Sequence, residues 1–249
     1  MDSIYYARRI QAAILPSDEI INTAIPQNFI LYRPKDIVSG DFYWFCKTSR
    51  EIMIAAVDCT GHGVPGAFMS IVGCNQLNHA VSVKKSRNAD DILNDLNKGV
   101  VRTLSDNDHE SKITDGMDLA LCVFNSDMSR VQFSGANNPM LLIRDNEVSQ
   151  FKPNKFPIGA YEGALPQVFT KVELDLRKND CLYIYSDGYA DQFGGPRDKK
   201  MTTKRFREKL LEIHKYPLEK QKTLLQEYLD EWKGEREQVD DILVIGIKI

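Results

Sequence analysis

The chain has 249 residues, of which 43% are hydrophobic, and a formal net charge of -3 at pH 7. This length suffices for one large domain or two small ones, and the small negative charge provides no basic field, which argues against nucleic-acid binding. The five cysteines are odd in number and form no Cys-x-x-Cys pair, so we expect reduced thiols and a cytoplasmic location. No stretch approaches the ~18 apolar residues of a membrane span, and no signal peptide is recognisable.

The first segment, residues 2–15, has the spacing of a short helix. Its apolar residues share one helical stripe, namely Ile4, Ala7, Ile10 and Ile14. Pro16 ends the pattern. We interpret residues 1–16 as a linker helix that continues from an upstream domain. The alternative is an ordinary N-terminal helix packed on the core.

Strand-like apolar runs dominate the chain from Phe29 onward. They are FILYR, DFYWFC, EIMIAAVD, MDLALCVFN, RVQFSG, PMLLIR, VFTKVEL, CLYIYSD and DILVIGIKI. Helical spacing appears around residues 64–72 and 92–100, and again over 203–233. Helices inserted in pairs between runs of strands predict an α+β sandwich of layers rather than alternating βαβ units.

Two polar segments are predicted to be loops. Residues 105–116 are rich in Asp, Ser and Gly. Residues 193–200, with the sequence FGGPRDKK, are interpreted as a mobile loop in which glycine, proline and charged residues rule out a packed element. Neither resembles a linker between domains, so residues 17–249 are expected to form one domain.

Aspartates stand at the ends of four predicted strands. Asp41 precedes an aromatic run, Asp58 and Asp187 each end an apolar run, and Asp240 and Asp241 begin the last one. A buried carboxylate costs several kcal/mol unless a cation compensates it, so convergence of these residues would imply a shared cation. Oxygen ligands suit Mg²⁺ or Mn²⁺, and two such ions could activate water against a phosphoryl group. The alternative is that each aspartate only caps a turn, which is common at strand ends.

The segment VDCTGHGVPGAFMS, residues 57–70, favours the metal-site interpretation. Gly61 and Gly63 permit close backbone approach, and Pro65 fits the first turn of a helix. A tight passage from strand to helix would place helix N-terminal amides beside Asp58. His62 in this turn is open to three roles, as a general acid, as a hydrogen-bond donor beside the metals, or as a turn residue.

Seven motifs in order resemble the SpoIIE-type (RsbU-like) serine phosphatases, the bacterial branch of the PPM or type-2C metal-dependent phosphatases. They are GDFYWF, VDCTGHGVPGAFMS, DGMDLALCVF, GANNPMLLIR, FPIG, YIYSDGYADQFGG and VDDILVIGI. The resemblance covers about residues 25–249. It implies a four-layer αββα sandwich of two antiparallel sheets flanked by helix pairs, with two Mn²⁺ or Mg²⁺ ions at one end.

The resemblance also implies site residues. Asp58 matches the ligand that bridges both ions, the backbone carbonyl of Cys59 matches a further metal contact, and Asp41 matches the aspartate that holds metal-bound waters. Asp187 and Asp240 match the remaining acidic ligands. Asp240 is preferred to Asp241 because the family's ligand precedes the polar residue that opens the last strand. Asp41 and Asp58 are the expected catalytic residues.

Four other positions are left open by the resemblance. Asp118 lies where some relatives hold a third, weakly bound metal, and a turn role is the alternative. Arg33 lies near the position of the eukaryotic phosphate-binding arginine, but no motif fixes it there. Asn137 and Asn138 are interpreted first as a turn between strands.

The function implied is hydrolysis of phosphoserine or phosphothreonine on a signalling partner, usually an anti-anti-sigma (STAS) protein. In this mechanism a water activated between two ions attacks phosphorus in line. The N-terminal helix resembles the linker to an upstream sensor domain, and a homodimer stays open. Two rivals are a catalytically silent module of the same fold that binds a partner without turnover, and an Asp-nucleophile phosphohydrolase. The second would need an Asp-x-Asp pair, which neither Asp41 nor Asp58 has.

Overall fold

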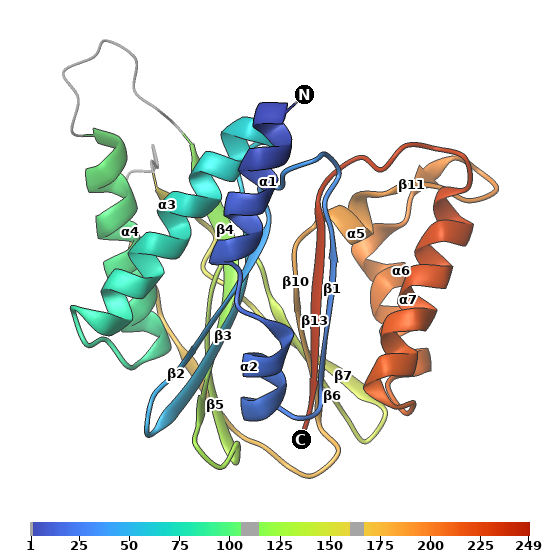
Figure 1. Cartoon of the computed structure of the whole chain (residues 1–249). Helices are drawn as coiled ribbons and strands as arrows, with labels where there is room; N and C mark the ends of the chain where they lie inside the picture. The colour runs from blue at the N-terminus through green and yellow to red at the C-terminus, as the bar shows by residue number, and fades with distance from the viewer. Residues whose placement is uncertain (1, 106–114, 160–166) are drawn as a thin grey trace.

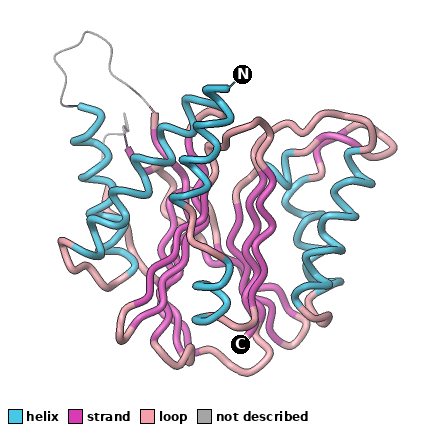
Figure 2. Tube along the Cα trace, viewed as in Figure 1, coloured by secondary structure: helices cyan, strands magenta, loops and turns pink. Residues whose placement is uncertain are grey.

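The chain folds as a four-layer sandwich in which two antiparallel sheets face each other and helices cover both outer faces (Figure 1). The computed structural model describes residues 2–105, 115–159 and 167–249. Figure 2 shows the strands of the two sheets gathered in the middle, with helices on either side. This arrangement confirms the predicted αββα architecture.

One sheet has five strands among the described residues and contains both the first and the last strand of the sandwich. Its spatial order is β1 (Asn28–Arg33), β13 (Ile242–Lys248), β10 (Cys181–Tyr185), β6 (Met140–Arg144) and β7 (Glu147–Phe151). β13 lies between β1 and β10 and pairs with both in antiparallel register. The last of these strands along the chain is therefore an internal strand of the sheet.

The facing sheet is built around two long strands. Its order in the described part of the chain is β2 (Phe42–Lys47), β3 (Glu51–Cys59), β4 (Gly116–Asn125), β5 (Arg130–Ala136) and β9 (Val172–Asp175), with β8 (Ile158–Gly159) paired to the start of β4. β3 is almost entirely buried, as its continuous apolar sequence predicts. Alternate residues of β3 point to opposite faces, so Met53, Ala55 and Val57 contact the helix layer whereas Ile52, Ile54 and Ala56 contact the other sheet.

Helix pairs form the two outer layers. The pair over the six-stranded sheet is α3 (Gly63–Ser82) and α4 (Ala89–Ser105), and the pair over the five-stranded sheet is α6 (Thr202–Ile213) and α7 (Leu218–Lys233). The remaining helices are short or peripheral, namely α1 (Asp2–Ile14), α2 (Asp18–Ala24) and α5 (Gly188–Asp191). α1 lies against α3 (Figure 1). Among the described residues, no helix combines the length and apolar character that crossing a membrane requires.

The structure corrects one loop prediction and leaves others untested. Residues 193–200 are not an unpacked loop. They form a small hairpin of β11 (Phe193–Gly194) and β12 (Lys199–Lys200), because Gly194 and Gly195 allow the backbone to lie directly against Trp232. Most of the predicted loop 105–116 lies outside the described residues. The helix predicted for residues 2–15 is present as α1, and its continuation into an upstream domain stays a prediction.

Candidate active site

Three aspartates form a row across one end of the six-stranded sheet. Asp58 on β3 and Asp118 on β4 are direct partners in the antiparallel register. Phe42 pairs with Val57, so Asp41, just before β2, lies beside Asp58 at the next position of the same register. Paired residues project from the same face of a sheet. The alternation along β3 and β4 makes this the face toward the five-stranded sheet.

The five-stranded sheet contributes two more carboxylates at the same end. Asp187 follows β10, and Asp240 precedes β13. These two strands are hydrogen-bonded neighbours in the sheet. A side chain at Gly188 would collide with the carbonyl oxygen of Asp241 and would lie 3.3 Å from Cβ of Asp240. The backbones that carry Asp187 and Asp240 are therefore in direct contact, which only a glycine permits.

The electrostatics show that the two groups of aspartates meet. Burial raises the pKa of Asp58, and the charges of Asp187, Asp240 and Asp118 raise it further. Burial also raises the pKa of Asp41, followed by the charge of Asp58, and Ser186 at the end of β10 partly lowers it. Carboxylates from both sheets thus lie close enough to repel one another.

Asp187 stands at the solvent-exposed rim of this group. Desolvation by the surrounding atoms raises its pKa to about 6, with further contributions from the charges of Asp191, Asp240 and Asp118, while Lys200 lowers it. Two predicted ligands, Asp187 and Asp240, therefore belong to the same electrostatic cluster as Asp58.

The donor set fits a hydrated divalent cation. Asp41 is 2% exposed, and its Oδ2 atom is buried without a hydrogen-bond partner. An orphaned carboxylate oxygen beside other carboxylates is costly unless a cation compensates it. Within residues 2–105, 115–159 and 167–249, no group of three or more His, Cys, Asp or Glu side chains is arranged closely enough to hold an ion by itself. Mg²⁺ needs few protein ligands because it keeps several waters.

Asp240 and Asp241 have different surroundings. Asp241 is buried, and both its oxygens accept backbone hydrogen bonds, Oδ1 from the N–H of Lys35 at 2.7 Å and Oδ2 from the N–H of Gly40 at 2.7 Å. Asp240 is partly exposed and accepts one bond, from the N–H of Asp241 at 2.8 Å. This difference supports the prediction that Asp240, rather than Asp241, is a metal ligand.

Three glycines place the Cys59 carbonyl beside Asp41. A Cβ atom at Gly40 would lie 3.2 Å from the Cys59 carbonyl oxygen, and one at Gly66 would collide with the carbonyl oxygen of Gly61. The Cys59 thiol points the other way, into the core under α3 and α4. Its pKa is raised by burial and by the nearby aspartates. Only the backbone of Cys59 is therefore directed toward the carboxylates, as the ligand prediction requires.

His62 belongs to a small polar chain at the rim. Its Nδ1 atom lies 2.8 Å from Asp36 Oδ2, and its Nε2 atom lies 3.2 Å from Lys35 Nζ. The ring precedes α3 without capping it by a side-chain hydrogen bond. Burial raises the pKa of Asp240, and among the effects that lower it are the charges of Lys35 and His62. His62 therefore lies near the carboxylates, and its role as a general acid stays a prediction.

Comparison with known proteins identifies the family of this chain. The family model described as stage II sporulation protein E (SpoIIE) matches residues 48–249, which is most of the chain. The chain belongs to the SpoIIE family. None of the curated protein sequences compared with this SpoIIE-family chain is a match.

Solved structures confirm the fold and the enzyme class. The SiaA-PP2C domain of Pseudomonas aeruginosa is 31% identical with a TM-score of 0.89, over 100% of this chain and 96% of that one. The PP2C phosphatase domain of SpoIIE from Bacillus subtilis is 19% identical with a TM-score of 0.70, over 90% of this chain and 63% of that one. The RsbU and RsbW domains of Rv1364c from Mycobacterium tuberculosis are 16% identical with a TM-score of 0.71, over 90% and 60%. The SpoIIE-family chain is thus a protein serine/threonine phosphatase of the PPM fold.

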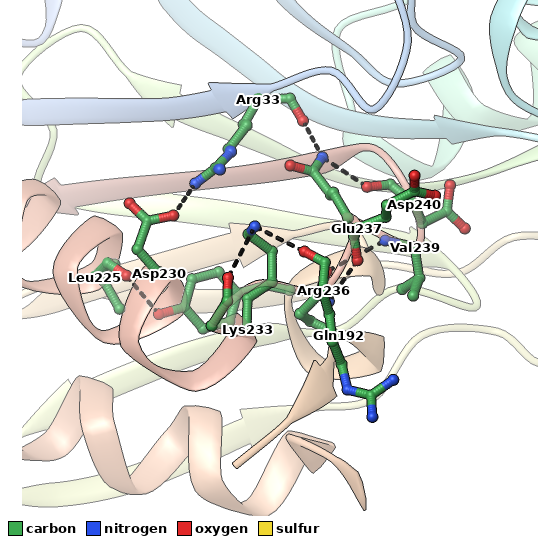
Figure 3. A network of polar contacts seen from close by, with 12 residues as sticks. Arg33, Gln192, Leu225, Asp230, Lys233, Arg236, Glu237, Val239 and Asp240 are labelled. Atoms are coloured by element: carbon green, nitrogen blue, oxygen red, sulfur yellow. Dashed lines mark hydrogen bonds and ion pairs between the residues drawn. The ribbon is translucent and has the colours of Figure 1, made fainter. Parts of the chain in front are cut away.

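Two of the open positions in this SpoIIE-family chain now have defined contacts. Arg33 donates from Nη1 to Oδ1 of Asp230 on α7 at 2.6 Å (Figure 3). Its side chain therefore contacts the helix layer rather than the aspartates of the candidate active site. Asn137 has a φ of 55° and donates from Nδ2 to Asp118 Oδ1 at 2.9 Å. Asn137 is therefore a turn residue, as predicted, and also holds the aspartate at the third candidate metal position.

One buried residue that supports the site was missed by sequence reasoning. Gln192 is 0% exposed. Its Oε1 accepts the N–H of Val239 at 3.2 Å, and its Nε2 donates to the Glu237 carbonyl at 3.0 Å (Figure 3). It joins the segment after Asp187 to the segment before Asp240. The only signal in the sequence is an isolated glutamine inside the motif YADQFGG.

Proposed function

We propose that this domain removes phosphate from phosphoserine or phosphothreonine on a signalling partner protein, and that the partner is a STAS-domain protein. The observation that carries the proposal is the meeting of Asp41, Asp58 and Asp118 from one sheet with Asp187 and Asp240 from the other. The STAS class of the partner comes from the motif resemblance, and a fold match to a chain that contains RsbU and RsbW domains is in keeping with a regulatory protein partner.

We propose that Asp41, Asp58, Asp187, Asp240 and the Cys59 carbonyl hold two Mn²⁺ or Mg²⁺ ions, with Asp118 available to a third. A structure of RsbX with the same fold contains magnesium. When bound, such ions supply Lewis-acid activation of water and offset charge on the transferring phosphoryl group. Asp58 suits a bridging role because it is central in the cluster and interacts with aspartates of both sheets.

The chain itself supplies the orientation of the site. Gly40 and Gly66 bring the turn at 59–62 against the segment that carries Asp41. Asp241 fixes the backbone before Asp41 through the N–H groups of Lys35 and Gly40. Rigid positioning of several ligands lowers the cost of organising the reaction. Lys35 adds positive charge at the rim, where an anionic phosphate would arrive.

The rival function is a silent module that binds a partner without turnover. A module without turnover has no need for a row of repelling carboxylates, which destabilises the fold in the absence of a cation. The presence of acidic side chains at all the predicted positions therefore favours the enzyme.

The decisive experiment measures phosphate release from a phosphoserine protein with added Mn²⁺, in the wild type and in Asp58→Asn. We expect the variant to lose activity by roughly 10²-fold or more, since one carboxylate serves both predicted ions. Calorimetric titration with Mn²⁺ should show weaker binding, while circular dichroism stays unchanged. Wild-type activity in Asp58→Asn would exclude the mechanism, and a wild type that binds its partner without releasing phosphate would favour the silent module.

A further inference from the structure

A groove lies on the hairpin β11–β12 next to the candidate active site. We call it the hairpin groove. It has a volume of about 750 Å³ and is lined by Phe193, Gly194, Pro196, Arg197, Asp198, Lys199, Lys200, Thr202, Arg205 and Trp232. Four of these residues are basic and one is acidic. The groove is therefore positively charged in a chain whose net charge is -3.

The hairpin groove is joined to the acidic rim by a short connection. Only α5 separates Asp187 from the hairpin. Lys200 Nζ lies 2.6 Å from Asp191 Oδ2 at the end of α5, and its charge reaches Asp187. A bound segment of a protein could therefore occupy the groove while one of its side chains reaches the carboxylate rim.

The basic residues of the hairpin groove differ in how they are paired. Arg205 is stacked 5.0 Å from the ring of Trp232. Asp198, the acidic lining residue, is neutralised by Arg236 at 2.5 Å. Arg197 and Lys199 are exposed, and within the described part of the chain no ion pair or hydrogen bond of their side chains is found. These two cations are available to an external anion.

The hairpin is held in place before any partner arrives. The N–H of Gly195 donates to the Trp232 carbonyl at 2.8 Å, and the Trp232 indole Nε1 donates to the Gln192 carbonyl at 3.1 Å. Gln192 is in turn bonded to the segment that leads to Asp240. A preorganised surface loses less conformational entropy on binding than a free loop.

We propose that the hairpin groove binds an acidic segment of the phosphoprotein substrate, adjacent in sequence to the phosphorylated residue. The proposal rests on the proposed function. The positive charges of Arg197 and Lys199, which are unpaired among the described residues, are complementary to acidic side chains, which favours a segment of that kind over a neutral or basic one. Arg197 and Lys199 form salt bridges with the segment, and the Phe193 and Trp232 rings provide apolar contact.

The test compares two phosphoserine peptides that differ only in their flanking residues, one acidic and one neutral. The variant is Arg197→Glu/Lys199→Glu. The charge-matched control is Lys178→Glu/Lys215→Glu, in which both exposed lysines lie near Cys181, at the opposite end of β10 from Asp187. We expect the variant to raise KM for the acidic peptide roughly tenfold at low salt with kcat unchanged. The effect should shrink in 0.5 M salt, and the neutral peptide and the control should not change.

Other outcomes would overturn the proposal. If the wild type has the same kcat/KM for both peptides, it has no preference for acidic flanking residues. If the control variant loses as much kcat/KM for the acidic peptide as Arg197→Glu/Lys199→Glu does, the effect comes from net charge and not from the groove. Preferential binding of a short single-stranded DNA would assign the groove to nucleic acid. The proposed function fails separately, by absence of Mn²⁺-dependent hydrolysis of either peptide, whereas the groove proposal fails with hydrolysis intact.

Discussion

Asp240 and Asp241 are neighbours with the same side chain and different surroundings. Both oxygens of the Asp241 carboxylate accept a backbone N–H group. Within the described residues, the Asp240 carboxylate accepts only one such bond, on Oδ1, so its other oxygen is available to a cation beside the other aspartates. One residue thus supports the fold, and the other is available for chemistry.

This contrast predicts opposite effects of two identical substitutions. Asp241→Asn places an amide N–H₂ where an oxygen now accepts the N–H of Lys35 or Gly40, so we expect a loss of about 2–3 kcal/mol in unfolding free energy. Asp240→Asn should leave the stability equal or higher, because it removes a repelling charge, but should weaken Mn²⁺ binding. Urea denaturation and calorimetry of both variants make the comparison. Equal destabilisation by the two substitutions would contradict it.

Asp187 predicts a pH dependence of the metal-free protein. Its pKa is about 6 in the folded state and about 4 in an unfolded chain. Between these values the folded state keeps a proton that the unfolded state has lost, so stability falls as the pH rises through this window. Asp187→Asn should show a shallower fall. Denaturation midpoints in EDTA across this pH range measure it, and an unchanged slope in the variant would count against the shift.

At the residue scale, the sequence indicated which aspartates stand at strand ends but not what surrounds them. The strand-end positions of Asp41, Asp58, Asp187 and Asp240 are visible in the sequence because each stands at the beginning or the end of an apolar run. The contacts of Gln192 depend on residues more than 40 positions away. No local pattern encodes such a contact.

Among the secondary-structure elements, α1 has a specific connection to the active site. Its buried Gln11 donates from Nε2 to the Ser39 carbonyl at 2.6 Å and to Ser70 Oγ at 3.0 Å, and its Oε1 accepts the N–H of Ser39 at 3.0 Å. Ser39 lies two positions before Asp41. The helix therefore fixes the backbone that presents Asp41.

Gln11→Ala should weaken both the fold and the site. Loss of the amide leaves buried backbone groups of Ser39 without partners, which costs about 1–3 kcal/mol. We also expect weaker Mn²⁺ binding because the Asp41 backbone loses a support. Tyr6→Ala on the exposed side of the same helix is the control, since Tyr6 is 62% exposed. If Gln11→Ala lowers stability without any effect on Mn²⁺ affinity, α1 has no connection to the site.

Long apolar elements were predictable, whereas short polar ones were not. β3 and β13 are recognisable because continuous apolar runs favour buried strands. The hairpin β11–β12 was wrongly assigned to a mobile loop, since its order comes from contact with Trp232 rather than from its own sequence. α2 and β7 were not predicted, because their short segments lack a clear apolar period.

For the whole molecule, the core between the sheets holds the two halves of the site together. Ile184 on β10 is 2% exposed in this core. Ile184→Ala should lower the unfolding free energy by about 2–4 kcal/mol, and Ile184→Val by about 1 kcal/mol. Urea denaturation of the two variants tests this graded loss. Equal effects of both substitutions would mean that contacts in this core do not determine the stability.

The layered architecture was predictable because the order of strands and helix pairs limits how apolar faces can be covered. The strand-end positions and the segment 57–70 favoured a shared metal site over isolated turn caps, and the resemblance named its ligands. The meeting of the aspartates at one end depends on the register of β3 with β4 and of β10 with β13, which pairs residues from distant parts of the chain.

The internal position of β13, between β1 and β10, has a consequence for biosynthesis. This strand separates β1 from β10, so the five-stranded sheet cannot form on the ribosome until residues 242–248 have left the exit tunnel. Until then β1 and β10 expose unpaired edges that are prone to aggregation. The nascent polypeptide therefore assembles its acidic centre only after the segment from Asp240 to Lys248 has emerged, whichever of the other strands are already folded.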